Sequence, residues 1–172
     1  MTQHQRLKEL GASKSSIMKA ASDYAKSVGL KPGAALEDLV HALGGKIRYL
    51  GFSNATSHDH ESIIIKNTND FEIFLPPHTS MARDRFTIAH ELGHYLLQYK
   101  KGMGVRAAGR SPGPSNERVE WEANWFAAGL LMPEDVFREK LTSSNHDIEE
   151  LAKYFGVSRK AVEIRAKDLN EF

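Results

Sequence analysis

The stretch that decides the fold is FTIAHELGHYLLQY, residues 86–99. It places His90 and His94 four positions apart, with Glu91 directly after the first histidine. On an α-helix, residues four apart are neighbours on one face, so both imidazoles can point at a common centre while the carboxylate flanks it. This HExxH spacing is a recognised pattern for two zinc-binding histidines and a general base. We therefore predict a helix from about Arg83 to Tyr99.

Composition limits the chemistry that such a helix can support. The 172 residues are 41% hydrophobic and 26% charged, which is typical of one globular domain. The chain has no cysteine, so a metal site must use histidines and carboxylates. A formal net charge of +1 gives no reason to expect nucleic acid or a membrane surface as a partner. The N-terminus is polar and no apolar segment is long enough to span a bilayer, so we expect a cytoplasmic protein.

The remaining pattern indicates an α+β fold. Apolar residues recur at helical spacing over 15–28 and 35–43, and again over 117–133. The runs KIRYLGF, ESIIIKN and DFEIFLP are rich in β-branched and aromatic residues, and they predict a small antiparallel sheet packed on the helices. The tail predicts two helices joined by GVS, with Ser158 as an N-cap, in a pair similar to a helix-turn-helix.

A catalytic zinc site needs three protein ligands, so the two histidines require a partner. The metzincin pattern would place a third histidine at position 100, where Lys100 stands. The segment ERVEWEANWFAAGLLMP offers Glu117, Glu120 and Glu122 on a second helix. Glu117 can share a face with Glu120, whereas Glu122 points about 160° away from it. Asn124 lies one turn after Glu120, where its amide oxygen could accept the ring N–H of a ligating histidine.

Two glycines inside the predicted helices also need a reason. Gly93 and Gly129 each cost about 1 kcal/mol relative to alanine in a helix interior. A close approach of the two helices at a metal centre would explain why both are tolerated.

Four segments together resemble a known family: ALEDLVHALGGKI, RFTIAHELGHYLL, EWEANWFAAGLLMP and LAKYFGVSRKAVEIR. Over about residues 15–168 the chain is similar to the ImmA/IrrE family of metallo-endopeptidases. The resemblance implies a minimal gluzincin-like zinc protease core with one Zn²⁺ per chain. By motif position it implies that His90, His94 and Glu120 bind the ion and that Glu91 is the general base. It further implies cleavage of an intracellular helix-turn-helix (XRE-type) repressor or an antitoxin, often encoded nearby on a mobile element.

On this basis we expect a metallopeptidase domain over residues 1–142 and a C-terminal helical pair over 143–172. Candidate donors to an oxyanion are His78, in the turn before the motif helix, and Tyr95. The alternatives are a solvated turn for His78 and a packing role for Tyr95. If the strand DFEIFLP lay at the sheet edge, an extended substrate could pair with it.

Two further segments are interpreted as solvent-exposed. The run from His58 to Glu61 holds four potential metal ligands, but its polar neighbours favour a solvated turn over a second metal site. The Gly-, Pro- and Lys/Arg-containing segment 100–116 favours a solvated loop over a lid on the cleft.

Two rival functions remain open. The chain could be a non-catalytic binding module that sequesters a repressor or toxin, or a DNA-binding regulator acting through its C-terminal helices. Residues 141–172 carry five basic and six acidic side chains, so DNA binding would rest on four basic residues: Arg159, Lys160, Arg165 and Lys167. We expect a protein partner instead. The sequence leaves the oligomeric state open, and Mn²⁺, Fe²⁺ or Co²⁺ would also accept such ligands.

Overall fold

A computed structural model describes residues 7–51, 62–101 and 115–171. The elements follow one another as α1 (Lys14–Ser27), α2 (Glu37–Ala42), β1 (Gly45–Tyr49), β2 (Ile63–Asn67), β3 (Asp70–Leu75), α3 (Met81–Gly93), the π-helical segment η2 (His94–Tyr99), α4 (Ser115–Leu131), α5 (Glu134–Ser143), α6 (Ile148–Phe155) and α7 (Arg159–Asp168). The run 58–61 and most of the segment 100–116 lie outside the described residues, so the interpretations of both stay predictions.

The predicted motif helix is confirmed, with two differences at its ends. It begins at Met81, two residues before the expected start, because the Ser80 side chain caps it by accepting a hydrogen bond from the backbone N–H of Arg83. From His94 onward the helix widens into π-helical geometry, a feature that is frequent at functional sites. Ser158 caps α7 as predicted, by accepting from the backbone N–H of Ala161. Helix α5 was not predicted as a separate element.

The sheet is mixed, so the prediction of a fully antiparallel sheet is wrong for one strand pair. Its order is β1-β3-β2, with β2 antiparallel and β1 parallel to β3. β3 takes the centre because three alternating side chains on it, Phe71, Ile73 and Leu75, are fully buried. In the described part of the chain, the edges of the sheet are therefore β1 and β2, and the strand DFEIFLP lies between them.

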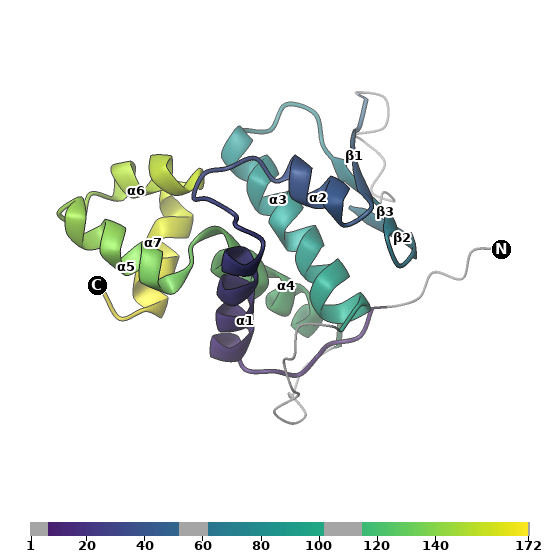
Figure 1. Ribbon diagram of the computed structural model, residues 1–172, viewed down its shortest axis with the longest axis horizontal. Coiled ribbons are helices and arrows are strands. Elements are labelled where there is room, and N and C mark those ends of the chain that lie inside the picture. The colour runs from purple at the N-terminus through teal and green to yellow at the C-terminus, as the bar shows by residue number, and fades with distance from the viewer. Residues whose placement is uncertain (1–6, 52–61, 102–114, 172) are drawn as a thin grey trace.

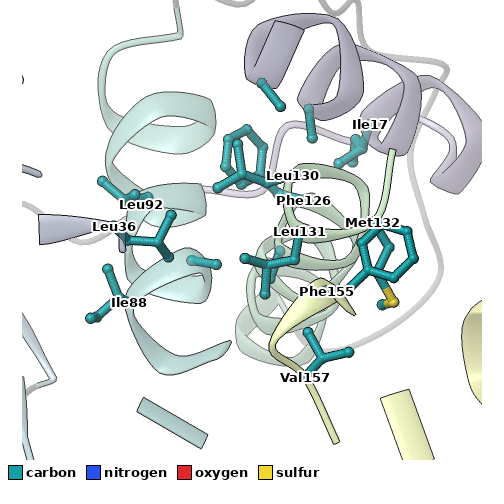
Figure 2. Packing of buried hydrophobic residues seen from close by; sticks show 14 of the residues in the cluster. Ile17, Leu36, Ile88, Leu92, Phe126, Leu130, Leu131, Met132, Phe155 and Val157 are labelled. Carbon is teal, nitrogen blue, oxygen red and sulfur yellow. The ribbon is translucent and has the colours of Figure 1, made fainter. Parts of the chain in front are cut away.

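The helices and the sheet share one hydrophobic core. α3 crosses the middle of the molecule, with the sheet on one side and α1 and α4 on the other (Figure 1). Phe71 of β3 stacks on Tyr95 of η2, with ring centroids 4.1 Å apart, so the sheet packs directly on the motif helix. Figure 2 shows Ile88 and Leu92 of α3 beside Leu36, with Leu131 on the neighbouring helix α4.

The C-terminal helices α5, α6 and α7 form a separate group in the view of Figure 1, yet they contribute to the same core. Phe137 and Phe155 stack with ring centroids 5.6 Å apart. Arg85 of α3 donates to the backbone carbonyls of Gly156 (3.1 Å), Phe155 (3.3 Å) and Ala34. The buried cluster thus runs across the boundary expected at residue 142. Within the described ranges, no helix combines the length and the apolar character needed to cross a membrane.

Candidate metal centre

Two helices meet at Gly93. A Cβ atom on this residue would lie 3.1 Å from the Cα of Ala123 and 3.2 Å from the Cβ of Phe126, both on α4. The glycine therefore allows the close approach of α3 and α4 that its position predicted. Gly129 serves a different contact, because a Cβ there would meet the backbone of Met18 on α1. The prediction that Gly129 also brings the two metal-site helices together is wrong.

This crossing brings three predicted ligands together. The Nε2 atoms of His90 and His94 lie 3.0 Å apart. The carboxylate of Glu120 lies 3.0 Å from His90 Nε2 and 3.3 Å from His94 Nε2. The side chain of His94 is 6% exposed and that of Glu120 is 56% exposed, so the cluster is closed at one side and open to solvent at the other. Among the described residues, these three form the one group of histidines and carboxylates that could hold a metal ion.

The spacing fits a tetrahedral zinc site. An ideal tetrahedron with Zn–N and Zn–O bonds of about 2.05 Å has edges of about 3.3 Å. The measured separations between the potential ligand atoms, 3.0 to 3.3 Å, match that edge within a few tenths of an ångström. The donor set of two imidazoles and one carboxylate is also one that zinc accepts at catalytic sites. The residues therefore fit the ion that the sequence resemblance implies.

Asn124 lies where it was predicted. Its Oδ1 is 2.8 Å from Nδ1 of His90, and it accepts a hydrogen bond when that nitrogen carries the proton. The Nε2 of the neutral ring is then free to bind a metal.

A second amide, which the sequence interpretation missed, serves the other histidine. Oε1 of Gln98 lies 2.6 Å from Nδ1 of His94. Gln98 follows His94 by four residues, so the same helical spacing that relates the two histidines could have identified it.

The ionisation of the cluster reflects these contacts. Hydrogen bonds from His90 and His94 hold the pKa of Glu120 well below its usual range. Burial lowers the pKa of His94, but hydrogen bonds to Glu120 and Gln98 and the charges of Glu91 and Glu120 outweigh burial, so this pKa is raised.

Glu91 lies beside the ligands and is 4% exposed. Burial raises the pKa of its carboxyl group, and the neighbouring His94 and His90 rings partly oppose this shift. The hydroxyl of Ser62, at the start of β2, donates a hydrogen bond to the carboxylate. Ser62 was not predicted, because no spacing in the sequence relates it to a helix that begins nineteen residues later.

The two candidate oxyanion donors are Tyr95 and His78. Tyr95 is fully buried, and its hydroxyl accepts a hydrogen bond from the backbone N–H of Asn69 at 2.9 Å. It packs in the core and has no surface for a substrate, so its assignment as an oxyanion donor is wrong. His78 lies in the turn before α3, which begins at Met81, and its role as an oxyanion donor stays a prediction.

The structure also gives the positions of Glu117 and Glu122, the two other glutamates considered as the third ligand. Glu117 is exposed and outside the ligand group. Glu122 points away from the ligands and is fully buried, where it accepts hydrogen bonds from backbone N–H groups.

The basic residues of the C-terminal pair are not all available to a partner. Arg165 is 2% exposed and donates from Nε to the carbonyl of Met132 at 3.1 Å. The Arg159 guanidinium lies 3.6 Å from Glu149. Of the four basic residues that DNA binding would need, Arg165 is therefore buried and Arg159 is paired with a carboxylate.

The fold and the candidate donor set are consistent with a metallopeptidase-like protein, and the family comparison supports this class. The chain belongs to the Peptidase M78 family, because residues 42–167 match the family model described as the IrrE N-terminal-like domain. The predicted family resemblance is confirmed. A solved structure named Mycobacterium tuberculosis transcriptional regulator matches with 20% sequence identity and a TM-score of 0.61. The match covers 85% of this chain and 45% of that one, and at this identity it concerns the fold alone. Comparison with curated proteins finds no match.

Proposed function

We propose that the chain is a zinc-dependent endopeptidase that cleaves a regulatory protein, specifically a helix-turn-helix repressor or an antitoxin. The observation that supports this most directly is the meeting of His90, His94 and Glu120 around one point, with Glu91 beside them. When bound there, zinc would lower the pKa of a water molecule and polarise the carbonyl of the scissile peptide bond.

The protein residues supply orientation and proton transfer. His90 and His94 would hold the ion through Nε2, because an amide oxygen faces the Nδ1 of each ring. Glu91 would take the proton from the attacking water and then deliver it to the departing amine. Burial raises the pKa of Glu91 toward the range in which a carboxyl group can both accept and release a proton.

We infer that an extended substrate would pair with a different strand from the one considered in the sequence analysis. Since β3 is central, the strand next to the site with a free edge in the described part of the sheet is β2. Ser62, directly before β2, bonds to Glu91, so the strand starts beside the general base. An extended peptide that paired with β2 would pass the carboxylate, and main-chain pairing would bind it without strong sequence preference.

The substrate class is supported by family membership. A protein substrate is consistent with a site that is open at Glu120 rather than enclosed as a small-molecule cavity. The buried Arg165 weakens the rival function of a DNA-binding regulator.

The experiment is metal analysis combined with a cleavage assay on purified protein and candidate repressors encoded near its gene. We expect one zinc per chain in the wild type and in Glu91→Gln, with cleavage reduced by at least about 100-fold in the variant. A variant that cleaves at the wild-type rate would disprove the general-base assignment. A non-catalytic binding module would sequester its partner equally well with Glu91→Gln and leave it intact.

A further inference from the structure

A series of hydrogen bonds leads from His94 away from the ligand cluster. Nδ1 of His94 lies 2.6 Å from Oε1 of Gln98. Nε2 of Gln98 donates to the carbonyl of Val119 at 2.8 Å and to Oε2 of Glu122 at 3.2 Å. Because both partners of Nε2 are acceptors only, the amide can have just one orientation. Its oxygen must therefore face His94, and Nδ1 of His94 must carry the proton.

This proton position decides what the other ring nitrogen can do. A neutral imidazole protonated on Nδ1 has its lone pair on Nε2. That is the atom of His94 that lies 3.0 Å from His90 Nε2 and 3.3 Å from the Glu120 carboxylate. The amide of Gln98 thus selects the tautomer that a metal ion needs, and it also fixes the direction of the ring.

Glu122 in turn holds Gln98. It is completely buried, and a buried carboxylate is costly unless donors surround it. It accepts from the backbone N–H groups of Leu10 and Gly11, each at 2.7 Å, and from Nε of Arg118 at 3.2 Å. Arg118 also donates to the carbonyl of Ala12. The hydrogen-bond network that holds His94 therefore extends to the N-terminal arm, which we define as residues 7–13.

We propose that Gln98 and Glu122 are positioning residues that hold His94 in the tautomer and orientation required for metal binding, with the N-terminal arm fixing Glu122. The inference rests on the proposed function, since it describes how this chain prepares a ligand of that metal site. Neither residue contacts the point where the ligand atoms meet, so both act through His94.

The alternative is a purely structural role, in which the same bonds only stabilise the packing of the arm on η2 and α4. Loss of such a bond would lower the melting temperature but leave the metal affinity of the folded protein unchanged. Zinc affinity of the full chain, measured by competition with a chromophoric chelator, separates the two roles. The variants are Gln98→Met, Glu122→Gln and the double variant, with Glu117→Gln as the matched control on the exposed face of α4.

We expect Gln98→Met to bind zinc about 10- to 100-fold more weakly, which is the usual effect of removing a hydrogen-bond partner of a ligating histidine. Glu122→Gln should weaken binding by a smaller factor, and Glu117→Gln should have no effect. Since Glu122 acts through Gln98, Glu122→Gln should cause no further loss in the Gln98→Met background. Wild-type affinity in Gln98→Met, or an equal loss from Glu122→Gln in both backgrounds, would overturn the proposal.

A measurement on the wild-type apoprotein needs no variant that might fail to fold. At about pH 9, where imidazole is neutral, ¹⁵N chemical shifts should show His94 protonated on Nδ1. A proton on Nε2 would overturn the positioning role. These results can be told apart from failure of the proposed function. A wild-type chain that binds no zinc refutes the function. A zinc affinity that is unchanged by Gln98→Met refutes only this inference.

Discussion

Gly93 of α3 packs directly on the backbone of Ala123 of α4, so closely that a Cβ atom would lie 3.1 Å from the Cα of Ala123. The candidate metal ligands are divided between these two helices, so we expect their spacing to depend on this contact. We expect Gly93→Ala to weaken zinc binding by about tenfold, because α4 must shift by a few tenths of an ångström. The gain in helix propensity, about 1 kcal/mol, offsets only part of an overpacking cost of about 1–3 kcal/mol.

Gly129→Ala is the matched control for this prediction. Its Cβ would lie 2.8 Å from the Cα of Met18 on α1, far along α4 from Glu120. We expect a larger loss of thermal stability than in Gly93→Ala, with unchanged zinc affinity of the folded protein. Equal zinc affinity in both variants would show that the helix crossing does not set the ligand spacing.

Glu120→Ala should lower zinc affinity by more than about 100-fold, because it removes one of three protein ligands. Glu117→Ala, one turn earlier and exposed, should bind zinc like the wild type. Elemental analysis after dialysis, followed by a chelator competition titration, checks both. Zinc retained in Glu120→Ala but lost in Glu117→Ala would show that Glu117, and not Glu120, is the third ligand.

Zinc affinity should depend on pH through His94. Burial alone would lower the pKa of this imidazole, but hydrogen bonds to Glu120 and Gln98 outweigh burial and raise the pKa above its ordinary 6.5. A protonated ring cannot bind metal, so binding must release the proton. The affinity should therefore be constant above the raised pKa and fall by about tenfold per pH unit below it. Chelator titrations from about pH 8.5 to pH 5.5 test this, and a fall that starts only below pH 6 would contradict it.

Tyr95→Phe distinguishes a packing role from a catalytic one. Removal of the hydroxyl leaves the backbone N–H of Asn69 without its acceptor, which should cost about 0.5–1.5 kcal/mol of unfolding free energy. The cleavage rate should stay within about twofold of wild type, whereas loss of an oxyanion donor would reduce it by about 100- to 1,000-fold. Denaturant unfolding and the cleavage assay, run on the same preparation, measure both quantities.

The histidine pair and Asn124 were predictable because their spacing is local, whereas the role of Glu120 was implied by the family resemblance. The positions of His90 and His94 follow from four-residue helical spacing, and so does the position of Asn124 relative to Glu120. The same rule applied to His94 would have identified Gln98. Ser62 and Glu122 could not be found in this way, because their contacts join segments that are distant in the sequence.

The sheet shows the same difference between what local sequence predicts and what contacts between distant segments decide. The β-branched and aromatic residues in DFEIFLP predicted a strand, and β3 is that strand. Its central place, and the parallel pairing with β1, depend on which strand buries the most side chains against α3 and η2. Alternation along one strand contains no information about which neighbour it pairs with. For this reason the sequence could not show that β3 is central, so the condition for a substrate to pair with it is not met, and pairing with β2 is a proposal.

By itself, the amino-acid sequence determined the helical faces that carry His90, Glu91, His94 and Glu120, because side-chain direction on a helix repeats with a fixed period. Only the tertiary structure decided that the faces of α3 and α4 meet, that Glu117 stays outside, and that the buried carboxylate of Glu122 links the N-terminal arm to His94. These outcomes depend on close packing between distant segments, which local periodicity does not encode.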